Sequence, residues 1–154
     1  MFQCYQENGC KAVLAFGGGS PMDCAKAICA RVAHPNRSVT QMQGLLRVLK
    51  RIPPLFAVPT TAGTGSEVTV AAVITDEARN YKLSVLGPQI SPTYAVLDPE
   101  LIMTAPASVA AACGVDALIH AMESYINTDA NPFSKAMAEA AMSLIGANIR
   151  AFVG

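Results

Sequence analysis

Apolar and polar positions divide the 154-residue chain into two parts with different patterns. Up to about residue 98, short continuous apolar runs alternate with turns rich in glycine and threonine, a pattern typical of strands buried on both faces of a parallel sheet. Beyond Pro99, Ala, Met and Leu recur at helical spacing, with almost no runs of β-branched residues. The pattern predicts an α/β part over residues 1–97, followed by an all-helical part over residues 98–154.

Three apolar runs predict the strands of the parallel sheet, at residues 12–16, 55–58 and 94–97. Two further runs, at residues 68–75 and 81–86, are separated by a five-residue polar loop. This spacing is typical of a β-hairpin, so we expect an antiparallel pair beside the parallel sheet.

Helix boundaries follow from turn and capping chemistry. After Gly17–Gly19 the sequence predicts a helix with Ser20 as its N-cap, Pro21 at the first helical position and Asp23 at the third. This helix should end before His34, which precedes a proline.

In the helical part, Gly114 is expected to separate a short helix from a longer one that begins near Val115. Pro132 permits a further helix start, and that helix should run to about Arg150.

Composition favours an enzyme that acts on small molecules. Eleven basic and eleven acidic side chains balance, and no cluster of Lys or Arg indicates a nucleic-acid or anionic-membrane face. The apolar stretch Leu101–Val115 is shorter than the roughly 20 residues that span a bilayer, and Pro106 interrupts it. The N-terminus does not resemble a signal peptide, and five cysteines without a C-x-x-C pair indicate a reduced, cytoplasmic setting.

The turn from Gly17 to Ser20 joins a strand to a helix N-terminus, an arrangement that can cradle phosphate. Its spacing fits neither the G-x-G-x-x-G pattern nor a P-loop. A tight turn with a capping box of Ser20 and Asp23 explains the same residues equally well, so both interpretations stay open.

The segment Thr60–Glu67 follows the second predicted strand and carries four hydroxyl side chains and two glycines. Open α/β sheets bind ligands at the carboxyl ends of their strands, where hydroxyl groups can bond a ribose or a phosphate. The alternative is a polar loop that satisfies its own backbone. Two such turns after two strands favour a shared ligand.

Asp116 and His120 lie four residues apart in a predicted helix, so both side chains project from one face. A carboxylate and an imidazole at this spacing can chelate one divalent ion, and the mixture suits iron(II) or zinc. A hydrogen bond on the helix surface is the commoner use of this spacing, and it stays open. The only other histidine, His34, is expected to face solvent.

Five motifs together resemble the iron-containing (group III) alcohol dehydrogenase family. They occur in the family's order and span nearly the whole chain: GGGSPMDCAKAI at 17–28, PTTAGTGSEVT at 59–69, ITD at 74–76, YAVLDPEL at 94–101 and GVDALIHAMESYI at 114–126. The resemblance implies part of an α/β dinucleotide-binding domain at 1–97 and the beginning of a helical metal- and substrate-binding domain at 98–154.

The resemblance also implies roles for individual residues. Those expected to bind the cofactor are Gly18, Gly19 and Ser20 at the pyrophosphate, Asp23 nearby, Thr60, Thr61 and Thr64 along the cofactor, Lys82 at its ribose, and Leu101 at the domain junction. Asp116 and His120 match the first two metal ligands of the family. No catalytic side chain beyond the metal ligands is implied.

The activity implied by the resemblance is reversible hydride transfer between an alcohol and NAD or NADP, assisted by Fe²⁺ or Zn²⁺. The family's two later histidine ligands have no counterpart after His120, and its opening strands are missing. We therefore expect an internal piece of a longer protein, which would be a homo-oligomer acting on a small alcohol or aldehyde. A catalytically incompetent chain with weak nucleotide binding, or a relative of glycerol dehydrogenase or dehydroquinate synthase, stays an alternative.

Overall fold

The computed structural model describes residues 1–77 and 79–154, so Ala78 in the predicted hairpin loop lies outside the described residues. Contacts between Cα atoms divide the chain into two compact units. Unit 1 consists of residues 1–60 and 65–99, and unit 2 of residues 61–64 and 100–154.

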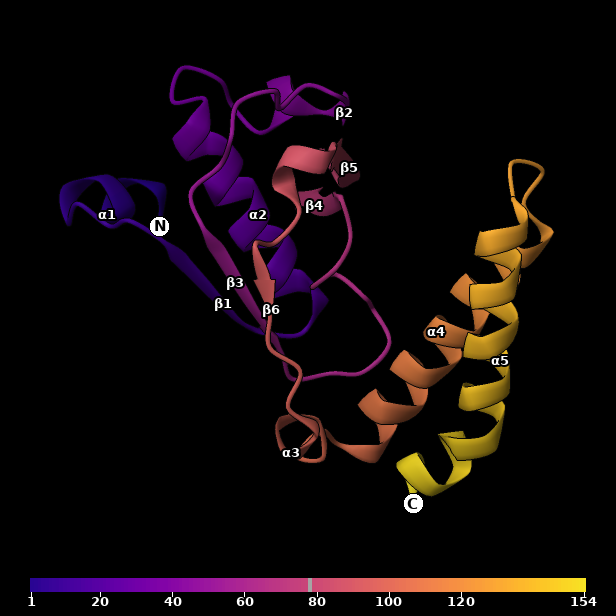
Figure 1. Ribbon diagram of the computed structural model, residues 1–154. Helices are drawn as coiled ribbons and strands as arrows, with labels where there is room; N and C mark the ends of the chain where they lie inside the picture. The colour runs from indigo at the N-terminus through magenta and orange to yellow at the C-terminus, as the bar shows by residue number, and fades with distance from the viewer. Residues whose placement is uncertain (78) are drawn as a thin grey trace. The chain divides into compact units, whose positions relative to one another are not determined.

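A parallel sheet forms the centre of unit 1. Strands β1 (Val13–Gly17), β3 (Leu55–Pro59) and β6 (Tyr94–Ala95) pair in the order β1-β3-β6 (Figure 1). The predicted α/β class and the three predicted parallel strands are therefore confirmed, although β6 is shorter than its apolar run.

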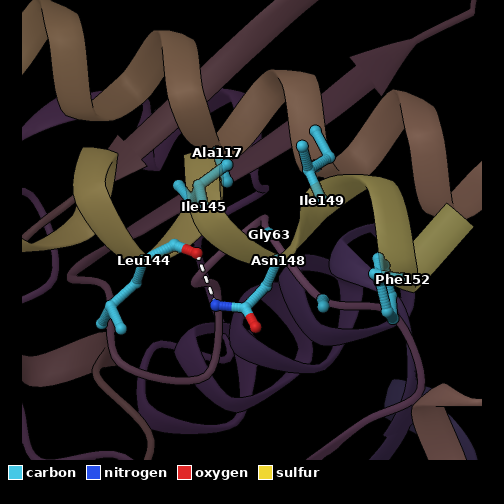
Figure 2. A pocket seen from close by; sticks show the side chains of 9 residues that line it. Gly63, Ala117, Leu144, Ile145, Asn148, Ile149 and Phe152 are labelled. Carbon is cyan, nitrogen blue, oxygen red and sulfur yellow. Dashed lines mark hydrogen bonds between the residues drawn. The ribbon is translucent and has the colours of Figure 1, made fainter.

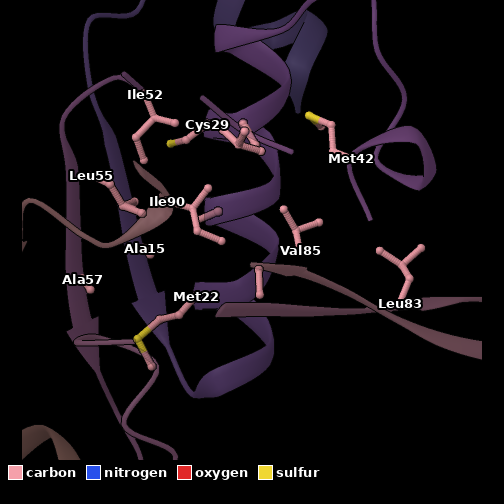
Figure 3. Packing of buried hydrophobic residues seen from close by; sticks show 14 residues of the cluster. Ala15, Met22, Cys29, Met42, Ile52, Leu55, Ala57, Leu83, Val85 and Ile90 are labelled. Carbon is pink, nitrogen blue, oxygen red and sulfur yellow. The ribbon is translucent and has the colours of Figure 1, made fainter. Parts of the chain in front are cut away.

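Helix α2 (Gly19–Ala33) covers one face of this sheet and ends before His34 as predicted. Its residues Met22 and Cys29 pack with Leu55 of β3 and with Ile90 in the main hydrophobic core (Figure 3). Burial raises the pKa of the Cys29 thiol to about 12, so this cysteine stays protonated in the folded protein. The core lies between α2 and the strands.

The opposite face of the sheet has a different character. Leu14 and Phe16 of β1 are 66% and 57% exposed, and Tyr94 of β6 stacks on Phe56 of β3 with ring centroids 4.9 Å apart. Apolar side chains thus point to both sides of the strands, as in a sheet made for burial on both faces, but the described residues pack closely on only one.

A second three-stranded sheet contains the predicted hairpin. Strands β4 (Ala71–Asp76) and β5 (Tyr81–Leu86) pair antiparallel, and β2 (Gly44–Leu45) pairs parallel to β5. Three short helices complete unit 1: α1 (Phe2–Glu7), η1 (Thr40–Met42) and η2 (Pro88–Ile90).

Unit 2 contains an antiparallel pair of long helices, α4 (Ala107–Ile126) and α5 (Pro132–Val153), which pack against each other. It also contains the short helix α3 (Pro99–Ile102), except for its first residue, which belongs to unit 1, and the separate segment 61–64. The start of α5 at Pro132 is as predicted. Asn131 caps this helix, since its side chain accepts from the Ser134 amide at 3.0 Å while the Ser134 hydroxyl accepts from the Asn131 amide.

The expected break at Gly114 is wrong, because α4 continues through this residue. A glycine that ends a helix commonly adopts a left-handed backbone conformation with positive φ. Gly114 does not have a positive φ, so its backbone is compatible with a continuous helix. Its lack of a side chain serves packing instead. A Cβ atom at this position would lie 3.0 Å from Cδ1 of Ile149, so glycine lets α5 approach α4 closely.

By length and composition alone, α4 and α5 are each apolar enough to cross a membrane, with a mean hydropathy of 1.2. This is weak evidence, because core helices of soluble proteins pass the same test. Helix α4 also carries Asp116, His120 and Glu123, and ionisable residues are costly within a bilayer.

Truncation of one buried and one exposed leucine tests whether a single sheet face is packed. In the 154-residue chain, Leu55→Ala should lower the free energy of unfolding by about 2–5 kcal/mol, because Leu55 is fully buried. Leu14→Ala should change it by less than about 1 kcal/mol, because most of this side chain contacts solvent. Urea denaturation measures both changes. Equal losses would show that the face carrying Leu14 is covered.

Candidate cofactor and metal site

The glycine-rich turn connects the carboxyl end of β1 to α2. Gly17 has a φ of +143°, and a Cβ there would lie 2.8 Å from Cγ of Pro21, so this position requires glycine. Gly18 is the N-cap of α2, and no side chain caps the helix. Because the first amides of a helix lack intrahelical partners, this turn can bind an anion.

Ser20 was predicted to be the N-cap, and the structure corrects this assignment. The helix begins two residues earlier than predicted, at Gly19, so Ser20 lies within its first turn and is exposed. The predicted capping partner, Asp23, is bound elsewhere: its carboxylate accepts from the Ser66 hydroxyl at 2.7 Å and from the Val73 amide at 3.0 Å.

The hydroxyl-rich segment begins beside the glycine turn. The Thr60 amide, directly after β3, donates to the Gly17 carbonyl at 3.0 Å. The turns after β1 and β3 therefore meet at one edge of the sheet, as expected for parallel strands. Thr61 and Thr64, both half-buried, belong to unit 2.

Two further predicted cofactor residues lie on other elements. Lys82 is an exposed residue of β5, opposite Thr75 of β4. Leu101 lies half-buried in α3, where its carbonyl accepts from the Thr104 hydroxyl at 3.0 Å.

Sequence reasoning missed Lys26, a fully buried residue of α2 with a relative exposure of 0%. Its ammonium donates to the Ser66 hydroxyl, the Thr69 hydroxyl and the Ala71 carbonyl at 2.8–3.0 Å. Burial lowers the pKa of Lys26, and the nearby carboxylates of Asp23 and Glu67 oppose this shift. The available signal was its position between Ala25 and Cys29, on the apolar side of the helix.

Asp116 and His120 project together from α4. The Asp116 carboxylate and Nε2 of His120 are 3.8 Å apart, and both side chains are at least half exposed. Ligand atoms lie about 2.0–2.2 Å from a zinc ion, so two atoms at this separation can bind one ion between them. Within residues 1–77 and 79–154 no group of three or more His, Cys, Asp or Glu side chains could hold a metal ion.

Segment 61–64 rests on the backbone of α4, which the sequence did not predict. Gly63 has a φ of +129°, and a Cβ there would lie 2.2 Å from the carbonyl oxygen of Cys113. Cys113 lies one helical turn before Asp116. The segment that carries Thr61 and Thr64 therefore packs against the helix that carries the two candidate ligands.

A cavity of about 340 Å³ lies between this segment and the two long helices of unit 2 (Figure 2). Its lining is apolar except for Asn148, whose amide donates to the Leu144 carbonyl at 2.8 Å. Ala117, next to Asp116 in the chain, lines it from α4 and Phe152 from α5. The cavity suits an apolar group rather than a charged one.

Comparison with known families and proteins identifies relatives along the whole chain. Residues 1–99 match the family described as iron-containing alcohol dehydrogenase, and residues 110–154 match the C-terminal part of the same family. The NAD-dependent methanol dehydrogenase of Bacillus methanolicus is 45% identical over 92% of this chain and 37% of its own length. The 1,3-propanediol dehydrogenase of Klebsiella pneumoniae is 39% identical over 95% of this chain and 38% of its own length.

Solved structures agree with these matches. A crystal structure of 1,3-propanediol oxidoreductase has a TM-score of 0.94 at 38% identity, covering 99% of this chain and 40% of that one. Sulfoacetaldehyde reductase from Bifidobacterium kashiwanohense, solved in complex with NAD⁺, has a TM-score of 0.88 at 32% identity, with the same coverage. The chain spans about 37% of the length of its methanol dehydrogenase relative.

Two glycine substitutions test the contact between segment 61–64 and α4. Gly63→Ala should displace the segment and destabilise the protein, because its methyl group would overlap the backbone of Cys113. Gly65→Ala is the matched control: its φ is also positive, at +62°, but nothing lies within 4 Å of the added carbon. Strain alone should cost the control about 1–2 kcal/mol. Thermal unfolding should therefore show a larger loss for Gly63→Ala, and equal losses would contradict the contact.

Proposed function

Because the chain belongs to the iron-containing alcohol dehydrogenase family, we propose that it carries cofactor- and metal-binding elements of an oxidoreductase. The reaction is reversible hydride transfer between a small alcohol and NAD or NADP. The observation that carries this proposal is the course of the segment after β3. It begins at the glycine turn with Thr60 and continues to Gly63, which packs against the helix of Asp116 and His120.

The first part of the proposal concerns the cofactor. Residues 1–97 form part of a dinucleotide-binding domain, in which the amides of Gly18, Gly19 and Ser20 at the N-terminus of α2 hold the pyrophosphate. Thr60, Thr61 and Thr64 offer uncharged hydroxyl groups along the cofactor. Lys82 extends from the hairpin towards its ribose, and Leu101 packs near it. Asp23 contributes indirectly, through its hydrogen bonds to Ser66 and Val73.

The second part concerns the metal. Residues 98–154 begin a helical domain in which Asp116 and His120 bind Fe²⁺ or Zn²⁺, a choice of metals that fits one oxygen and one nitrogen donor. Two donors leave coordination positions for other ligands. A metal bound there would supply Lewis acidity towards an alcohol oxygen, and NAD(P) would accept the hydride.

The third part concerns substrate and setting. Relatives are named for methanol, choline and 1,3-propanediol, which supports a small alcohol, or the corresponding aldehyde in the reverse direction. The family resemblance supports a homo-oligomer, the five cysteines without a C-x-x-C pair support a cytoplasmic setting, and the balanced charge supports the absence of nucleic-acid and anionic-membrane partners. The absence of a third metal ligand among the described residues favours one alternative, a chain that binds nucleotide without catalysis.

Removal of one metal ligand tests the proposal in the complete protein. Asp116→Ala should lose bound metal and alcohol-dependent NAD(P) reduction while it keeps its fold, since the Asp116 side chain is half exposed and contacts His120 on the surface of the same helix. Glu139→Ala is the control, because it removes an exposed carboxylate from α5. Metal content is measured by mass spectrometry and turnover by NADH absorbance. Unchanged metal content and turnover in Asp116→Ala would refute the metal site. A wild-type protein that binds metal but shows no turnover would favour the non-catalytic alternative.

A further inference from the structure

Lys26 has a position that the proposed cofactor and metal sites do not explain. Transfer of an ammonium group from water into a protein interior is costly unless the charge is paired and hydrogen-bonded. An alanine or leucine would continue the apolar side of α2 formed by Met22, Ala25 and Cys29 without that cost. The environment of Lys26 therefore has to explain why a charge is buried here.

All three N–H groups of the ammonium have acceptors. They lie at the Ser66 hydroxyl (3.0 Å), the Thr69 hydroxyl (2.9 Å) and the Ala71 carbonyl (2.8 Å). A lysine ammonium has three donors, so none remains for a ligand. The acceptors all come from residues 66–71, the stretch that links the hydroxyl-rich segment to β4.

Asp23 completes the arrangement one helical turn earlier. Its carboxylate lies 3.7 Å from the Lys26 ammonium, accepts from the Ser66 hydroxyl at 2.7 Å and accepts from the Val73 amide at 3.0 Å. Ser66, which is buried, therefore contacts both charged groups. Residues 66–73 are thus fixed to α2 at four points by a pair of opposite charges.

We propose that Asp23 and Lys26 form a clamp that positions the hydroxyl-rich segment relative to the phosphate-binding end of α2. Lys26 is a positioning residue in this inference, which rests on the proposed function because it takes NAD(P) as the ligand. The glycine turn lies at the start of the helix that carries both charges, and Thr64 is two residues from Ser66. Fixing residues 66–73 to this helix orders the segment before the cofactor binds, so binding no longer has to pay for that ordering.

A buried ion pair is not required for stability alone, because well-packed apolar residues can replace such pairs at little cost. A clamp and a purely stabilising contact therefore predict different results. Loss of the clamp should weaken cofactor binding by the folded protein and loosen residues 66–73, in addition to any fall in melting temperature. Loss of a stabilising contact should lower the melting temperature and leave the cofactor affinity of the folded protein unchanged.

The experiment compares two pairs of variants of the complete protein. Lys26→Met removes the charge and keeps most of the side-chain volume, and Lys135→Met is its control at an exposed position of α5. Thr69→Val removes one acceptor and keeps the shape, whereas Thr69→Ser keeps the acceptor. NADH affinity is measured by fluorescence titration, and amide hydrogen exchange reports on residues 66–73.

We expect Lys26→Met to weaken NADH binding about tenfold, the effect of one lost hydrogen bond to a charged group. Thr69→Val should act in the same direction, and both should speed exchange in residues 66–73, while Thr69→Ser and Lys135→Met behave like the wild type. Wild-type affinity and exchange in both Lys26→Met and Thr69→Val would overturn the clamp. If Lys26→Met does not fold, the two Thr69 variants decide. A wild type that binds no NADH would refute the proposed function, and hydrogen exchange alone would then decide on the clamp.

Discussion

Parallel pairing of β1 with β3 is the constraint on which the proposed cofactor site depends. Parallel strands bring their carboxyl ends to the same edge of a sheet, so two turns that are about 40 residues apart in the sequence become neighbours. The hydrogen bond from Thr60 to Gly17 is the direct expression of that pairing. The glycine turn and the segment that begins at Thr60 need this register, because a shift of one strand would separate them.

Unit 2 is held together differently. Among the described residues, its buried apolar side chains are small ones from α4 and α5, namely Ala110, Ala121 and Ala138, so the helices pack closely but enclose little core. Large apolar side chains such as Ile119 and Leu144 remain exposed.

The strands and most helix ends could be predicted from sequence, since they depend on local patterns. Two strands follow directly from the apolar runs at 12–16 and 55–58, and helix α5 begins at the proline at 132. Each of these signals determines the structure of the residues next to it. Contacts between distant residues were predicted less well. Gly114 was wrongly predicted to end a helix. Glycine is needed there because the side chain of Ile149 packs against it, and Ile149 lies 35 residues further along the chain. Asp23 was assigned to a cap because its partners, Ser66 and Val73, lie in another segment, and Lys26 was missed for the same reason. Local patterns suggested the glycine turn, the hydroxyl-rich segment and the Asp116–His120 pair as ligand sites, whereas the specific role proposed for each residue came from motif resemblance.

Helix α2 carries two thiols in opposite environments. Cys24 is exposed and Cys29, five residues further on, is completely buried. A small thiol reagent can modify the first in the folded protein, whereas it reaches the second only when the helix separates from the sheet. The ratio of the two modification rates gives the fraction of time that the core is open, with each molecule serving as its own internal standard.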